Sequence, residues 1–185
     1  MLQPMSRDVF YDRNLGIRFY LEKDYRLKTH DYTRKGFYFI TIGTYFKESL
    51  FGEIHPTKIA LTPLGNKVDE LIPEISKYNP HIRIDCSVVM PDHVHILLEI
   101  KYAISQRRQM GTIKGMKYGS VSYAIRNFKS AVTRWSRKNG HAHYVWQRRF
   151  HDSVVRDGDK GVQAIRDYIK SNPAKAIYKY NNPRD

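Results

Sequence analysis

In this 185-residue chain, the spacing of two histidines, His93 and His95, is the feature that most directly suggests a chemically active site. They begin an apolar segment, residues 93–100, whose composition is typical of a strand. Side chains alternate between the two faces of a strand, so both histidines share one face with Leu97 and Glu99. The aliphatic residues between them form the opposite, core face. Two imidazoles on one face can bind a metal ion together, whereas one surface histidine and one packed histidine are the commoner outcome of this spacing.

An alternating strand precedes the histidines and is expected to pair with their strand in antiparallel fashion. A three-residue loop over residues 90–92 opposes Val88 to Val94. It keeps the aliphatic side chains of both strands on the core face, since a one-residue slip would expose them. The same register sets Arg83 opposite Glu99, which is a favourable charge pair. Glu99 is therefore expected to pair with Arg83, and further metal ligands must come from another part of the chain.

The last predicted helix carries two polar residues beside its core stripe. It begins at Asp157 or Asp159 and ends before Pro173, because the residue before a proline disfavours helical geometry. Its apolar stripe consists of Val162, Ile165 and Ile169. Tyr168 lies next to this stripe, and Asn172 lies one turn further on the same side. A tyrosine in such a position commonly packs with its hydroxyl at the rim of the core, so spacing alone does not select Tyr168 among the 14 tyrosines.

The net charge of +14 is confined to the second part of the chain. Residues 1–100 carry 13 Lys and Arg against 13 Asp and Glu, whereas residues 101–185 carry 19 against 5. Such an asymmetry favours a polyanionic partner, most often nucleic acid, because basic side chains release the counterions of the phosphates. A solvated basic surface that aids solubility is the alternative.

A basic helix after Ser120 supplies most of the candidate nucleic-acid contacts. Ser120 is a suitable N-cap, and an apolar stripe follows it on one face, with arginines on the other. Single-strand binding combines a positive groove with aromatic rings that stack on bases. The candidate DNA contacts are Arg126, Lys129, Arg134, Arg148 and Arg149. The candidate stacking residues are Tyr118, Tyr123 and Trp146, of which Trp146 is equally well placed to be a core residue.

The remaining pattern predicts one α+β domain in which helices pack on one face of an antiparallel sheet. Further strands are expected near residues 37–46, 50–54, 58–61 and 153–155, and a helix from Thr62-Pro63 that kinks at Pro73. The predicted divisions are an N-terminal arm (1–35), a catalytic domain (36–176) and a C-terminal tail (177–185). The single cysteine excludes an intramolecular disulfide. Without a signal peptide or a long apolar run, the protein is expected in the cytoplasm, without membrane contact.

Three stretches resemble, in order and separation, the signatures of the single-tyrosine HUH transposases. They are Met-Pro-Asp-His-Val-His at 90–95, Val-Trp-Gln-Arg-Arg-Phe at 145–150 and Asp-Tyr-Ile-Lys-Ser-Asn-Pro at 167–173. This family includes the transposases of small bacterial insertion sequences and the REP-associated tyrosine transposases. The resemblance covers roughly residues 35–175. A His-hydrophobic-His element alone is unspecific, but the three stretches in this order are fairly specific.

The resemblance implies a ferredoxin-like sheet with the histidine strand at its centre. It further implies that His93 and His95 bind a divalent ion, Mg²⁺ or Mn²⁺, and that Asn172 completes the metal site. Tyr168 would be the nucleophile that forms a 5′-phosphotyrosine link. The implied substrate is hairpin-bearing DNA, which is cut and rejoined as a single strand. Relatives act as monomers or as homodimers, and the sequence does not decide between the two.

Three other functions remain open at this point. One is a metal-dependent nuclease that uses the two histidines and an activated water without a covalent step. Another is a non-catalytic ferredoxin-like module that binds nucleic acid. The third is a domesticated relative that keeps the nicking chemistry but no longer mobilises an element.

Overall fold

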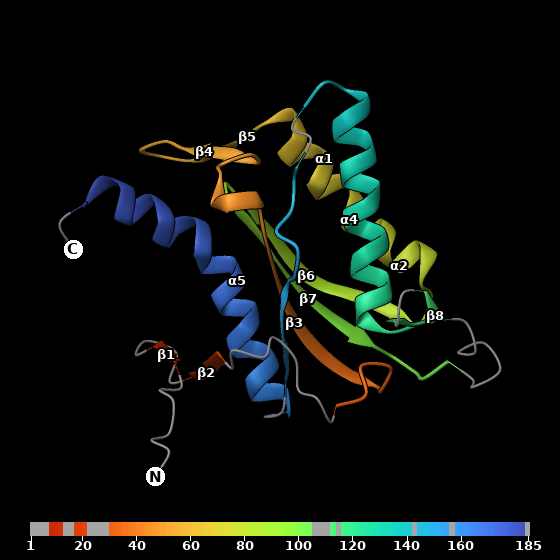
Figure 1. Ribbon diagram of the computed structural model, residues 1–185. Coiled ribbons are helices and arrows are strands. Elements are labelled where there is room, and N and C mark those ends of the chain that lie inside the picture. The colour runs from red at the N-terminus through yellow and green to blue at the C-terminus, as the bar shows by residue number, and fades with distance from the viewer. Residues whose placement is uncertain are drawn as a thin grey trace, which may run out of the picture.

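A four-stranded antiparallel sheet forms the centre of the computed structural model (Figure 1). The structure describes residues 8–12, 17–21, 30–104, 112–113, 116–141, 144–155 and 158–183. The sheet has the order β10-β3-β7-β6, with β3 (Gly36–Gly43), β6 (Ile82–Met90), β7 (His93–Ile100) and β10 (His151–Val154). Each neighbouring pair is antiparallel, so the predicted α+β class is confirmed. The histidine strand β7 is one of the two central strands, as the family resemblance implies.

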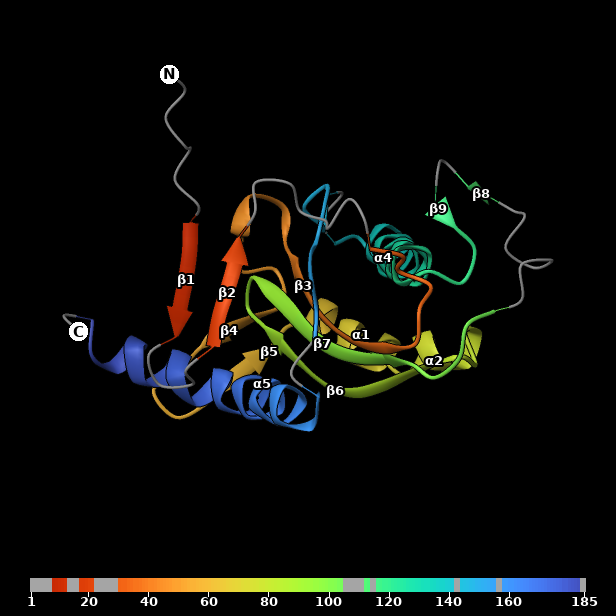
Figure 2. The ribbon, with the colours of Figure 1, turned by 90° about the horizontal axis from the view of Figure 1, so that it is seen from below.

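Helices cover both faces of this sheet. One face packs against α1 (Pro63–Leu71), α2 (Glu74–Tyr78) and α4 (Val121–Lys138). The opposite face, which carries the histidines, packs against α5 (Gly158–Asn181), and Figure 2 shows α4 and α5 on opposite sides. The sequence predicts helices on one face only. The second layer forms because Phe39 and Leu97 are apolar residues on the histidine face, and Val162, Ile165 and Ile169 of α5 bury them.

The predicted N-caps of α1 and α4 are confirmed. The Thr62 hydroxyl accepts a hydrogen bond from the Gly65 amide at 3.0 Å, and the Ser120 hydroxyl accepts one from the Tyr123 amide at 3.2 Å. Pro73 separates α1 from α2, as predicted. Smaller elements are β1 (Asp8–Asp12), β2 (Ile17–Leu21), the 3-10 helix η1 (Tyr45–Lys47), β4 (Gly52–Ile54), β5 (Ile59–Leu61), β8 (Thr112–Ile113) and β9 (Met116–Lys117).

The helix α5 does not end before Pro173 but continues to Asn181. A proline inside a helix removes one backbone hydrogen bond and disfavours the conformation of the preceding residue. Contacts on both sides of the proline offset this loss. Ile169 is buried before it, and after it the side-chain nitrogen of Asn181 donates to the Pro56 carbonyl oxygen at 2.9 Å. The predicted tail therefore begins inside the helix. None of the helices in the described part of the chain is long and apolar enough to span a membrane.

The pairing of β6 with β7 contains a β-bulge at Asp85. The connection is a two-residue turn that sets Met90 opposite His93 and Val89 opposite Val94, so the predicted three-residue loop is wrong. Beyond the bulge the pairing agrees with the prediction, and Arg83 lies opposite Glu99 with a 2.9 Å hydrogen bond. The extra residue in β6 reverses, between the bulge and the turn, which side chains point to each face of the sheet. Val88 and Cys86 therefore pack beneath α5, while Val89 enters the main core.

Candidate active site

The two histidines of β7 converge through their Nε2 atoms, which are 3.1 Å apart. His95 is buried, with 4% of its surface exposed, and His93 is half-buried. The other ring nitrogen of each histidine has its own partner. His93 Nδ1 donates to Asp92 Oδ1 at 2.6 Å, and His95 Nδ1 is 2.9 Å from the hydroxyl oxygen of Thr41 on β3. The orientation of both rings is therefore fixed by contacts at Nδ1, while their Nε2 atoms face each other.

This arrangement fits a divalent cation at the meeting point. A carboxylate only accepts hydrogen bonds, so His93 carries its proton on Nδ1 and keeps a lone pair on Nε2. The Thr41 hydroxyl can accept from Nδ1 of His95 in the same way, which is the usual support of metal-binding imidazoles. Two nitrogens at about 2.1 Å from an octahedral ion and at right angles are about 3.0 Å apart. The measured separation of 3.1 Å agrees with this value.

The charge state of the pair also suits metal binding. Burial, together with the neighbouring His93, lowers the pKa of His95 to about 3. His95 is therefore a neutral imidazole at physiological pH, as a metal ligand must be. The hydrogen bond from His93 holds the pKa of Asp92 below its usual range, so Asp92 is a carboxylate. Among the described residues no group of three His, Cys, Asp or Glu side chains could hold a metal, so a further ligand must be of another type.

Tyr168 of α5 packs directly against this centre. Its ring meets the ring of His95 at a centroid distance of 5.3 Å and the ring of Phe39 at 5.8 Å, both edge-on. Phe39 in turn stacks on His95 at 5.2 Å. The Lys175 amine lies 5.6 Å from the centre of the Tyr168 ring. The fold thus brings Tyr168 and the histidine pair of the same chain together.

Asn172 lies one turn beyond Tyr168, as the spacing predicts. Its side-chain nitrogen donates to the Tyr168 backbone carbonyl oxygen at 3.2 Å. With the nitrogen bound to the helix, Oδ1 is the atom that would coordinate a cation. The role of Asn172 as a metal ligand stays a prediction.

Gln147 is a site residue that sequence reasoning missed. Its backbone amide donates to the Gly43 carbonyl oxygen at 2.9 Å, and Gly43 is the cross-strand partner of His93. A Cβ atom on Gly43 would lie only 2.8 Å from Cδ of Gln147, so the carboxamide occupies the space beside His93. Within the described chain this carboxamide has no hydrogen-bond partner. No local periodicity marks Gln147, and the signal in the sequence is its place within the signature stretch 145–150.

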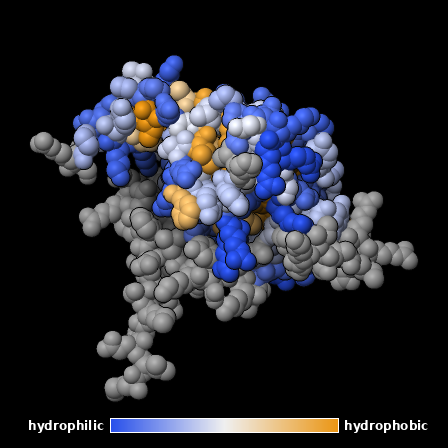
Figure 3. Space-filling model, turned by 45° about the horizontal axis from the view of Figure 1, so that its top comes forward, coloured by the Kyte–Doolittle hydropathy of each residue, from blue (hydrophilic) through white to orange (hydrophobic). Residues whose placement is uncertain are grey.

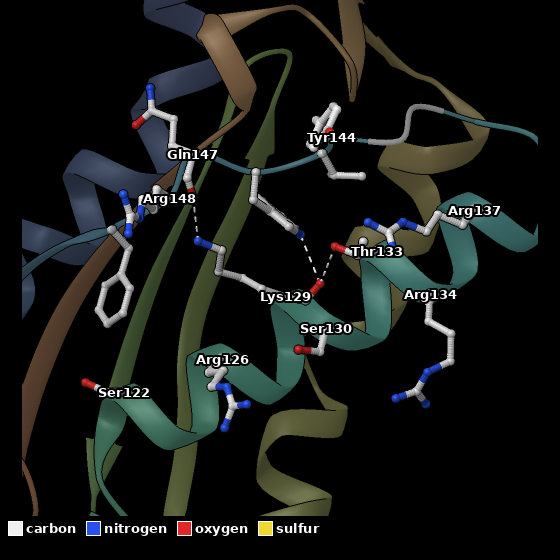
Figure 4. A pocket seen from close by; sticks show the side chains of 13 residues that line it. Ser122, Arg126, Lys129, Ser130, Thr133, Arg134, Arg137, Tyr144, Gln147 and Arg148 are labelled. Carbon is white, nitrogen blue, oxygen red and sulfur yellow. Dashed lines mark hydrogen bonds between the residues drawn. The ribbon is translucent and has the colours of Figure 1, made fainter. Parts of the chain in front are cut away.

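A basic groove of about 750 Å³ runs along α4 on the other side of the sheet (Figure 4). Basic and hydroxyl side chains line it together with aromatic and aliphatic ones, and hydrophilic side chains dominate the surface over α4 (Figure 3). Of the predicted DNA contacts, Arg126, Lys129, Arg134 and Arg148 line it, and Arg149 does not. The groove is linked to the site through Gln147, whose carbonyl oxygen accepts a 2.6 Å hydrogen bond from the Lys129 amine. Burial lowers the pKa of Lys129 to about 8.

Of the three aromatic candidates for base stacking, Trp146 is a core residue, whereas Tyr118 and Tyr123 are half-buried. Trp146 is buried between Phe51 and Phe128, at ring distances of 5.0 and 5.8 Å. Its Nε1 donates to the Lys129 carbonyl oxygen at 3.2 Å, so the core alternative is correct for Trp146. Tyr118 and Tyr123 contact each other edge-on at 4.9 Å.

The sheet carries two convergent histidines on a central strand, and a helix packs a tyrosine against them. This is the arrangement that the resemblance to the single-tyrosine HUH transposases implies. Residues 57–172 match the family described as "Transposase IS200 like", and the chain belongs to this family. The resemblance seen in the sequence is therefore confirmed.

Two further comparisons show what the chain is similar to in sequence and in fold. An uncharacterized protein of Haemophilus influenzae (strain ATCC 51907 / DSM 11121 / KW20 / Rd) is 37% identical over 172 residues, which cover 86% of this chain and 91% of the relative. A solved structure of the REP-associated tyrosine transposase bound to a REP hairpin has the same fold, with a TM-score of 0.57. The two chains are 20% identical, and the match covers 82% of this chain and 74% of that one.

Proposed function

We propose that the protein is a metal-dependent single-strand DNA endonuclease and strand transferase. It cleaves and rejoins hairpin-bearing DNA through a covalent 5′-phosphotyrosine intermediate on Tyr168. The observation that carries the proposal is the contact of the Tyr168 ring with His95, whose Nε2 faces that of His93 at 3.1 Å. A nucleophile candidate and a candidate cation site are thus adjacent in a chain of the IS200-like transposase family.

The histidines would hold Mg²⁺ or Mn²⁺, with Asn172 Oδ1 as a third ligand. Nitrogen ligands suit Mn²⁺ better than Mg²⁺. When bound, the ion polarises a non-bridging phosphate oxygen and stabilises the departing 3′ oxygen. Asp92 and Thr41 contact Nδ1 of the two imidazoles, which would leave each Nε2 available to the ion.

Tyr168 performs the covalent step. Its hydroxyl loses a proton, its oxygen forms a bond to phosphorus, and the bond from phosphorus to the 3′ oxygen breaks. The 3′ oxygen leaves and takes up a proton as a 3′-hydroxyl. The phosphotyrosine conserves the energy of the diester, so a 3′-hydroxyl can later attack it and release the tyrosine. Rejoining therefore needs no outside energy source.

DNA is the proposed substrate because of the charge and shape of the α4 side. The groove places four arginines and Lys129 along α4 and the 144–150 segment. Arginine side chains bind phosphates through paired hydrogen bonds, and a positive groove follows a single strand. The solved relative that shares the fold was bound to a REP hairpin, which supports a hairpin substrate here.

A covalent-capture experiment tests this function. The protein is incubated with Mn²⁺ and a labelled hairpin that carries a single-stranded 5′ extension, and the products are run on a denaturing gel. We expect a protein–DNA band that disappears in Tyr168→Phe and persists in Tyr180→Phe, a control in the exposed end of the same helix. Cleavage without a covalent band would indicate the nuclease alternative. Binding without cleavage would indicate the non-catalytic module.

A further inference from the structure

Three exposed aromatic side chains gather at the end of β3, and we call them the aromatic cluster. Tyr45, Phe46 and Tyr144 expose 38%, 77% and 69% of their surface. The Tyr45 ring lies 4.3 Å from that of Phe46 and 5.3 Å from that of Tyr144, measured between centroids. Single exposed apolar residues are ordinary, but a contiguous exposed group indicates a binding surface.

The backbone at the exposed residue Phe46 adopts an unfavourable conformation. Phe46 has φ 51° and ψ 21°, and Lys47 has φ 56°. Both angles lie in the left-handed region, which residues with a side chain rarely adopt. Backbone strain of this kind concentrates at binding and catalytic sites, where the surrounding structure enforces it.

Hydrogen bonds fix the aromatic cluster to the candidate active site. Thr44 is fully buried, and its amide donates to the Asp92 carbonyl oxygen at 2.8 Å. Asp92 is the residue whose carboxylate holds His93. The Tyr45 amide donates to the Val145 carbonyl oxygen at 3.0 Å, which ties the turn to the segment that carries Tyr144. The cluster is therefore attached to both the histidine loop and the 144–150 segment.

The cluster also borders the basic groove. Tyr144 lines that groove together with Arg148 and the arginines of α4 (Figure 4). The cluster thus adjoins the basic groove through Tyr144 and the loop of Asp92 through the neighbouring Thr44. Positive charge beside exposed aromatic rings is the combination that single-stranded nucleic acid requires, because its bases are free to stack. Bases inside a duplex already stack on each other and do not offer their faces.

We infer that Tyr45, Phe46 and Tyr144 form a stacking surface for unpaired bases of single-stranded DNA next to the reactive phosphate. The identity of this ligand rests on the proposed function. A second copy of the chain is a weaker match, because each side of a stable protein interface contributes roughly 20–30 residues, against three rings here.

Binding measurements without chemistry test this inference. All proteins carry Tyr168→Phe and are titrated without divalent ions, by fluorescence anisotropy, against a hairpin with a single-stranded 5′ extension and against the same hairpin without it. We expect Phe46→Ala and Tyr144→Ala each to weaken binding of the extended hairpin about fivefold or more. Binding of the hairpin without extension should not change. Tyr78→Ala, which removes a ring that is 73% exposed on α2, is the matched control.

Two substitutions at Phe46 separate stacking from other apolar contact. Phe46→Trp should retain the affinity for the extended hairpin, and Phe46→Leu should lose it, because only an aromatic ring stacks on a base. A 2-aminopurine in the extension should be quenched by the parent protein and not by Phe46→Leu. The inference is overturned if the alanine variants bind both hairpins equally more weakly, or if they bind both as well as the parent protein does. It is also overturned if Phe46→Ala changes the oligomeric state in size-exclusion chromatography. The binding assay does not depend on cleavage. It therefore tests the stacking surface even if covalent capture shows that the proposed reaction does not occur.

Discussion

Arg166 of α5 binds Asp85 of β6 through two hydrogen bonds, Nε to Oδ2 at 2.7 Å and Nη2 to Oδ1 at 2.8 Å. Asp85 is the bulge residue of β6, and only 6% of its side chain is exposed. Arg166 stands two residues before Tyr168 on the same helix. The bidentate pair therefore sets the position of the tyrosine helix over the histidine strand, as paired guanidinium and carboxylate groups are rigid in geometry.

Asp85→Asn removes the charge of this pair while keeping the shape of the side chain. We expect covalent adduct formation to slow roughly tenfold to 100-fold, because small displacements of a nucleophile cost rates of that order. Hairpin binding should stay unchanged. The measurement is single-turnover adduct formation on a denaturing gel. Glu70→Gln, which breaks an exposed pair with Lys67, is the control and should react at the normal rate.

The same substitution has a predicted pH dependence. The hydrogen bond from Arg166 lowers the pKa of Asp85 below its usual 3.8. A lowered carboxyl pKa contributes stability above the unfolded value, and this contribution disappears as pH falls through the folded value. The difference in unfolding free energy between the parent protein and Asp85→Asn should therefore shrink below about pH 3.8. A constant difference in urea unfolding from pH 6 to pH 3 would contradict this account.

Local patterns in the sequence were enough to predict the histidine face, the caps of α1 and α4 and the stripe of α5. The details that complete the site depend on contacts between distant segments. The bulge at Asp85 is stabilised by Arg166, 81 positions away in sequence. The placement of Gln147 depends on the approach of its segment to Gly43. The helix-breaking tendency of Pro173 predicts an end of α5 that is too early, because this local tendency does not include the tertiary contacts beyond Pro173.

The hydroxyl of Thr41 is predicted to support His95 as a metal ligand. Thr41→Val has the same shape and removes the partner of His95 Nδ1. Loss of such a supporting hydrogen bond weakens metal binding by about 10- to 100-fold. The measurement is the Mn²⁺ dissociation constant, from electron paramagnetic resonance of the free ion. Thr133→Val, which removes a hydroxyl that donates to the Lys129 carbonyl oxygen on α4, is the control. An unchanged Mn²⁺ affinity in Thr41→Val would show that Thr41 does not support the ligand.

Two substitutions at Asn172 test it as the third ligand. A carboxylate binds a divalent ion more strongly than an amide, so Asn172→Asp should lower the Mn²⁺ dissociation constant about tenfold, and Asn172→Ala should raise it. A purely structural role predicts another pattern. Both variants lose the 3.2 Å hydrogen bond from the side-chain amide to the Tyr168 carbonyl oxygen. If both lower the melting temperature equally and leave Mn²⁺ affinity unchanged, Asn172 serves the helix alone.

Lys129 should make the stability of the protein depend on pH in the alkaline range. Its pKa is lowered by burial to about 8, against the ordinary lysine pKa of 10.5. Between these values the unfolded chain binds more protons than the folded one, so the unfolding free energy contributed by this residue rises with pH. The slope is at most about 1.4 kcal/mol per pH unit. Lys129→Met cannot titrate and lacks this contribution.

Urea unfolding at pH 7.5 and pH 9.5 measures the effect. The parent protein should gain stability relative to Lys129→Met by about 1 to 2 kcal/mol between the two conditions. Lys138→Met, a change in an exposed residue at the end of the same helix, controls for removal of a lysine and should follow the parent protein. Lys129 also donates to the Gln147 carbonyl oxygen at 2.6 Å, so Lys129→Met is expected to be less stable at pH 9.5 than the parent. A stability difference that is the same at both pH values would mean that Lys129 keeps its ordinary pKa in the folded protein.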